Sequence, residues 1–162
     1  MHPAKLLLSF CQWALNSPFG RGVRDSTWLF PAIEICHLLA LGLLGGTVLI
    51  LNLRLLGLRF QDDPVAELAA DVWPWMLGSL TTMLASGFFL FSSEAVKMYG
   101  NAAFRAKMAS LALAILFTFT IHRKTVFAEE ARIPPARRRL AALISLALWA
   151  AVGLSGRAIG YV

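Results

Sequence analysis

The chain has 162 residues, of which 58% are hydrophobic and only 15% are charged. Because so few charges cannot cover the surface of a soluble domain of this length, we expect a single-domain integral membrane protein. The net charge of +6 would suggest nucleic-acid binding in a soluble protein. Here the Lys and Arg residues lie beside apolar segments, where they set topology and contact lipid headgroups. The expected partner is therefore the bilayer, and not nucleic acid.

Residues 1–26 are predicted to form an amphipathic helix and a linker. Lys5, Ser9, Gln12 and Asn16 recur at steps of four, three and four, which places them on one narrow face of a helix. Mostly apolar side chains fill the remaining faces. This pattern is typical of a helix that lies in the headgroup region of a membrane.

Residues 27–162 contain four apolar segments, with expected membrane spans at about 27–53, 72–93, 102–122 and 140–158. About 20 residues are enough for a helix to cross the hydrocarbon core. Because every connection is short, neighbouring helices should be antiparallel, which predicts an all-α, up-down four-helix bundle with both chain ends on one side. Lys and Arg are almost equally frequent near the two sides, so the positive-inside rule does not choose an orientation.

Small and hydroxyl-bearing residues predict which faces of these spans pack together. In the first span, Gly42 and Gly46 form a G-x-x-x-G pattern that favours close helix contact. The second span carries a hydroxyl stripe that we expect to face the other helices: Ser79, Thr82, Ser86 and Ser93. The fourth span has one face of mainly small residues: Ser145, Trp149, Gly153, Gly156 and Gly160.

The polar residues inside the spans are the candidates for function, because ionisable groups are costly in a bilayer. Glu34 and His37 are three residues apart, so they share a face of the first helix, about 9 and 14 Å into the span. The topology brings charged groups from the other three helices to the same end of the bundle: Glu94, Arg105, Lys107 and Arg157. We expect a binding site centred on His37, with Glu34 accepting a hydrogen bond from its ring.

Three ligands fit such a cluster. A haem b would use His37 as an axial ligand to iron, with Met108 as the other ligand and Arg105, Lys107 and Arg157 at the propionates. A quinone head group or an anionic lipid would use the same polar residues. The alternative interpretation is that Glu34 and His37 hydrogen-bond each other and only fix helix packing.

Further polar residues occur towards the opposite end of the bundle. His122 lies too far along its span to share an iron with His37 and, beside Arg123, is expected at the membrane interface. Asn52 and Arg54 lie at the end of the first span.

Several short motifs resemble a bacterial family of small four-helix membrane proteins known only as a domain of unknown function. The motifs are Phe30-Pro31, the Glu34/His37 pair, Gly45-Gly46, residues 52–57 and 90–95, residues 104–107, His122 and Gly156-Arg157. The resemblance spans most of residues 28–160. It implies a four-helix fold in the bacterial inner membrane and supplies no activity. The family pattern has Asp where this chain has Asn52, which removes a possible charge at this position.

The functional expectation is a membrane-embedded, redox-linked subunit that holds haem or quinone near His37 and works with other membrane subunits or with further copies of itself. One alternative is a cofactor-free structural subunit or assembly factor. Another is a transporter or channel formed by an oligomer. The sequence has no nucleophile–base pair and no phosphate-binding loop, so we do not expect an enzyme by itself.

Overall fold

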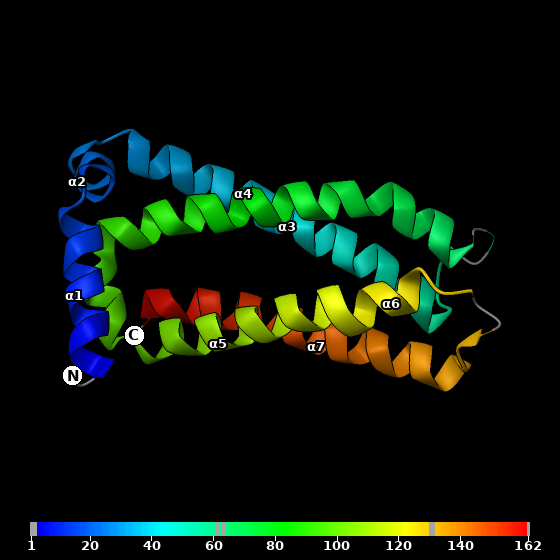
Figure 1. Ribbon diagram of the computed structural model, residues 1–162. Coiled ribbons are helices and arrows are strands. Elements are labelled where there is room, and N and C mark those ends of the chain that lie inside the picture. Colours follow the sequence, from blue (N-terminus) through cyan, green and yellow to red (C-terminus); the bar gives the residue numbers. More distant parts are fainter. Residues whose placement is uncertain (1–2, 61, 63, 130–131, 162) are drawn as a thin grey trace.

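The computed structural model describes residues 3–60, 62, 64–129 and 132–161, and within these residues it is all-α, as predicted (Figure 1). The first half of the chain forms α1 (Pro3–Asn16), α2 (Pro18–Asp25), α3 (Leu29–Leu56) and α4 (Val65–Gly100). The second half forms α5 (Ala102–Phe117), the π-helical turn η1 (Thr118–His122), α6 (Arg123–Val126), α7 (Pro135–Ala158) and the 3-10 turn η3 (Ile159–Tyr161).

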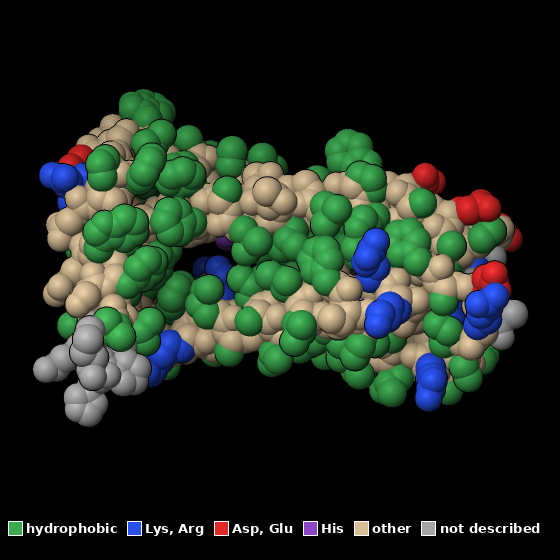
Figure 2. Space-filling view, viewed as in Figure 1, with side chains coloured by type: hydrophobic (Ala, Val, Ile, Leu, Met, Phe, Trp, Pro, Cys, Tyr) green, Lys and Arg blue, Asp and Glu red, His purple; other side chains and the backbone are tan. Residues whose placement is uncertain are grey.

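Four helices are long and apolar enough to cross a membrane: Leu29–Leu56, Val65–Gly100, Ala102–Val126 and Pro135–Tyr161. Figure 2 shows that apolar side chains cover much of the long sides of the molecule, whereas acidic side chains gather at its two ends. This distribution is that of a membrane protein, because the sides of the bundle contact lipid and its ends contact water.

Several helices begin or end outside the spans expected from the sequence, and nearby residues explain these boundaries. α4 begins at Val65 rather than at 72, because Glu67 and Asp71 in its first turns do not interrupt a helix that continues into water. α7 begins at Pro135, a residue suited to the first helical position because it has no N–H to leave unpaired. α3 ends at Leu56, and the φ of 75° at the following Gly57 allows its N–H and that of Leu58 to bond the last carbonyls of the helix.

A single residue, Asn101, connects α4 to the helix that follows. Its side chain accepts a hydrogen bond of 3.0 Å from the N–H of Phe104 and so caps α5. The chain therefore turns from the end of α4 into α5 at one residue.

The first two helices run across one end of the bundle (Figure 1), and we call α1 and α2 the collar. In α1, Cys11 and Ala14 pack against Ala95 of α4. Ser9, Gln12 and Asn16 of the expected polar stripe are exposed, and the side chain of Lys5 lies outside the described part of the structure. The direction of α1 is that of a helix lying along a membrane surface.

A kink near the end of α4 makes room for the collar. Glu94 leaves helical geometry (φ −131°, ψ 25°). Just before it, the hydroxyls of Ser92 and Ser93 donate to the carbonyls of Phe88 and Leu90, a bond that favours helix bending. The end of α4 thus turns alongside α1, as Figure 1 shows.

The four long helices form two antiparallel pairs, α3 with α4 and α5 with α7 (Figure 1). The pairs meet in the middle of the bundle through an apolar core that includes Leu44, Met76, Leu80, Ala114 and Val152. A second apolar cluster, which includes Leu51, Val65 and Val126, joins them near the end opposite the collar. Towards the collar the two pairs separate.

Of the faces predicted to pack against other helices, the hydroxyl stripe of α4 is mostly buried and the glycine pattern of α3 is not in a close contact. Ser79, Ser86 and Ser93 of the hydroxyl stripe are buried, as expected, whereas Thr82 is exposed. The prediction of close packing at the G-x-x-x-G pattern is wrong within this chain. A Cβ atom added at Gly42 or Gly46 would have no described atom within 4 Å, because α4 packs on another face of α3.

Candidate functional site

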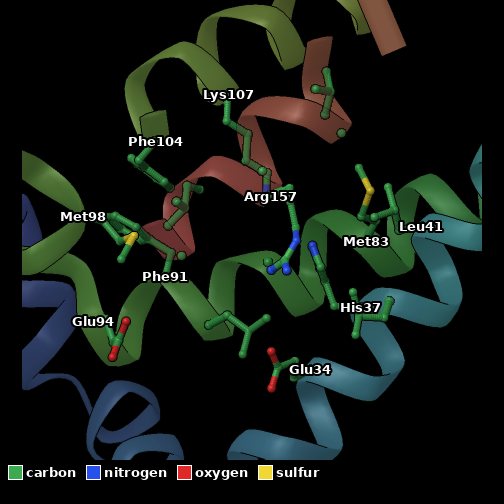
Figure 3. A pocket seen from close by; sticks show the side chains of 18 of the residues that line it. Glu34, His37, Leu41, Met83, Phe91, Glu94, Met98, Phe104, Lys107 and Arg157 are labelled. Carbon is green, nitrogen blue, oxygen red and sulfur yellow. The ribbon is translucent and has the colours of Figure 1, made fainter. Parts of the chain in front are cut away.

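A cavity of about 440 Å³ fills the space where the two helix pairs separate. Figure 2 shows an opening at this place, with a histidine and basic side chains visible inside it. The polar residues that line the cavity come from all four long helices: Glu34 and His37 from α3, Glu94 from α4, Lys107 from α5 and Arg157 from α7. The structure thus brings these predicted residues together around one cavity (Figure 3).

His37 is fixed by α4 and not by Glu34. Its Nδ1 atom lies 2.9 Å from the hydroxyl of Ser86. The prediction that Glu34 accepts a hydrogen bond from His37 is therefore wrong, because the ring turns towards the neighbouring helix and Glu34 stays exposed. A Cβ at position 87 would lie 3.2 Å from Cε1 of His37, so Gly87 provides the space that the ring occupies.

Lys107 enters the cavity from the opposite pair of helices. The end of its side chain passes over Gly156 of α7, where an added Cβ would lie 3.5 Å from both Cε and Nζ. Among the described residues, no carboxylate lies within ion-pairing distance of its ammonium group. Arg157 extends into the same space, and its guanidinium lies 4.9 Å from the ring centre of Tyr161. Lys107 and Arg157 therefore bring two positive charges to a cavity that the carboxylates of Glu34 and Glu94 also line.

Aromatic side chains form the wall of the cavity nearest the collar. The rings of Phe91 and Phe104 stack with centres 5.4 Å apart. Phe10 of α1 stacks on the other side of Phe91 at 6.4 Å and on Trp13 at 5.8 Å. The collar is thus joined through aromatic contacts to an apolar wall of the cavity.

The remaining residues predicted for this site lie at its edge or outside it. Glu94 lines the cavity and pairs with Lys97 at 3.6 Å. Arg105 is exposed and does not line the cavity. Met108 is 47% exposed and also points away, so it does not supply the expected second haem ligand from inside the cavity. Met83 and Met98 are the methionines that line it.

A separate polar cluster lies at the far side of the core. His122 is only 2% exposed, so its side chain lies inside the bundle. The amide of Asn52 donates to Ser145 Oγ at 3.1 Å and to the carbonyl of Val48 at 2.8 Å. Its oxygen lies 3.1 Å from Nε2 of His122 and can only accept, so Nε2 carries the proton. The cluster joins α3, the π-helical turn and α7. Arg54 is buried as well.

Sequence reasoning missed Ser86 as the partner of His37 and missed the aromatic wall. Ser86 was recognised only as a member of a buried hydroxyl stripe. The small-residue face of the last span contained the signal for the cavity, because Gly153, Gly156 and Gly160 all line it. Side chains in these places would fill the space.

The comparisons with known proteins give a family and no activity. A family model described as a family of unknown function, DUF6644, matches residues 10–162. No curated protein and no solved structure matches the chain.

Proposed function

Since the chain belongs to this family, whose description carries no activity, we propose from its geometry that it is a redox-linked subunit of the bacterial inner membrane that binds a quinone in the cavity at the collar end. The observation that carries the proposal is that His37 and Lys107, from different helix pairs, line one cavity with aromatic walls. The cavity volume is within the range of ordinary small-molecule sites.

A quinone head group has two oxygens on opposite sides of a flat ring. It therefore needs a polar partner at each oxygen and apolar surface against the ring. His37 and Lys107 supply the polar partners, and Phe91 and Phe104 supply the apolar surface. The isoprenoid tail would leave between the helix pairs into the lipid. A haem or iron–sulfur protein in the same membrane complex would exchange electrons with the bound quinone.

The test uses a matched pair of basic residues on α5. Lys107→Met removes the charge inside the cavity and keeps an apolar side chain of similar length, whereas Arg105→Met removes an exposed charge outside it. We expect Lys107→Met to weaken binding of decylubiquinone to the purified protein about tenfold, the loss of one charged hydrogen bond. Arg105→Met should bind as the wild type does.

The same purification distinguishes the other functions. Quinone extracted from the wild-type protein supports the proposal. A Soret band that disappears in His37→Ala would assign haem to the cavity instead. A protein without pigment that does not bind quinone would leave the cofactor-free structural role.

A further inference from the structure

The hydrogen bonds of Ser86 determine which nitrogen of His37 carries the proton. A serine hydroxyl has one hydrogen to donate. Ser86 Oγ lies 2.6 Å from the carbonyl of Thr82 and 3.3 Å from that of Met83, and carbonyl oxygens can only accept. The hydrogen of Ser86 is therefore directed at the backbone. In its 2.9 Å contact with His37, Ser86 must accept, so Nδ1 of His37 carries a hydrogen.

It follows that Nε2 of neutral His37 has a free lone pair, because a neutral imidazole has only one N–H. Nε2 makes no hydrogen bond with a described side chain, and it is not among the buried polar atoms without a partner. It therefore stays accessible from the cavity that His37 lines. The ring occupies the space beside Gly87, where an added Cβ would lie 3.2 Å from Cε1.

The opposite side of the cavity has the reverse polarity. Lys107 and Arg157 have only donor hydrogens and cannot accept. A ligand that bridges the cavity thus meets an acceptor on α3 and donors on α5 and α7. The matching ligand has a hydrogen to donate at one end and an oxygen that accepts at the other.

We propose that the cavity selects the reduced form of its ligand, a quinol, over the oxidised quinone, with His37 Nε2 accepting a hydrogen bond from one quinol hydroxyl and Lys107 donating to the oxygen across the ring. This inference rests on the proposed function and specifies the ligand form. An oxidised quinone has two carbonyl oxygens and no hydrogen to donate, so its oxygen would face the lone pair of Nε2. Ser86 is a positioning residue, because it acts only by holding the ring of His37 in one tautomer and orientation.

The experiment compares the affinities of the intact, detergent-purified protein for decylubiquinol and decylubiquinone without oxygen. We expect the wild type to bind the quinol about tenfold more tightly, the effect of one hydrogen bond made in place of an unpaired contact. In Ser86→Ala the ring can turn and take the other tautomer, so the two affinities should become nearly equal while binding itself persists.

Ser79→Ala is the matched control. Ser79 is also buried on α4 and donates to the backbone carbonyl of Met76 at 3.1 Å, but it makes no hydrogen bond with His37. It should keep the wild-type preference. A wild type that binds both forms equally, or the quinone more tightly, overturns the inference and leaves quinone binding intact. A protein that binds neither form overturns the proposed function and the inference with it.

Discussion

The two histidines within the described spans are held by polar partners on neighbouring helices, and the partners give them opposite tautomers. Ser86 accepts from Nδ1 of His37 and leaves Nε2 accessible from the cavity. Asn52 accepts from Nε2 of His122 and leaves Nδ1 buried without a partner in the described structure. The first arrangement leaves a ring nitrogen open to the cavity, whereas the second leaves a ring nitrogen buried in the core.

The Asn52 cluster should therefore be a stability element. Asn52→Leu removes the acceptor of His122 Nε2 and leaves this buried N–H unpaired, so we expect a loss of about 1–2 kcal/mol in the free energy of unfolding. Unfolding of the purified protein in mixed detergent micelles measures it. Ser145→Ala removes one of the two acceptors of the Asn52 amide and should cost less. An Asn52→Leu protein as stable as the wild type would show that the cluster contributes nothing.

Sequence reasoning identified His37 and Lys107 because a charged or ionisable side chain in an apolar span stands out by its cost. It could not identify the Ser86 contact. This bond joins residues 49 positions apart on antiparallel helices, and its formation depends on their relative rotation and axial position. Serine also bonds readily to its own helix, so the hydroxyl stripe did not require a side-chain partner.

At the scale of elements, the collar depends on the absence of a side chain at Gly20. A Cβ there would lie 2.5 Å from the carbonyl oxygen of Ala14, 2.8 Å from that of Ser92 and 2.9 Å from that of Leu15. All three are backbone atoms, which cannot move aside as a flexible side chain can. α2 therefore contacts both α1 and the kinked part of α4 through Gly20.

Gly20→Ala should separate the collar from α4 and lower the free energy of unfolding by about 1–3 kcal/mol, the usual effect of overpacking. Faster proteolysis within residues 3–25 would report the separation. Gly22→Ala is the control, because a Cβ at Gly22 meets no atom within 4 Å and alanine favours a helix. Equal proteolysis of the two variants would contradict a structural role for Gly20.

The hydropathy of the sequence predicted that four long apolar helices are present, but it did not predict the residues at which they begin and end. The Asn101 cap and the left-handed Gly57 are local signals that appear in the sequence. The kink at Glu94 is different, because no proline marks it and the two serines before it favour a bend without fixing its position. Its position depends on packing against the collar, which hydropathy does not describe.

At the scale of the whole molecule, the topology makes a direct prediction. In a protein whose Cys11 and Cys36 are replaced, single cysteines at positions 25 and 100 should be labelled from one side of the membrane. Single cysteines at 58 and 128 should be labelled from the other side (Figure 1). A membrane-impermeant thiol reagent on intact and inverted vesicles measures this. Labelling of positions 25 and 58 from the same side would exclude a span by α3.

Short connections predicted antiparallel neighbours correctly, but they could not predict that the helices pack as two pairs that separate at one end. A bundle whose four helices stay in contact along their whole length and a bundle whose two pairs separate at one end have the same order of helices along the chain. The difference arises from the space left at Gly153, Gly156 and Gly160, and from the collar that packs on α4 beyond the separation. Both are tertiary effects that act between distant parts of the chain.

The division into two helix pairs has a consequence for biosynthesis. The ribosome releases α3 and α4 before α5 and α7. The hairpin of α3 and α4 can therefore enter the membrane and pack against the collar while α5 and α7 are still being made. Ser86 and His37 then meet early, because both belong to the first hairpin. Lys107 and Arg157 arrive with the second. The cavity is thus completed only when α7 has inserted. In a truncated chain that ends before α7, we expect His37 to keep its contact with Ser86, but the cavity would lack the wall that α7 forms.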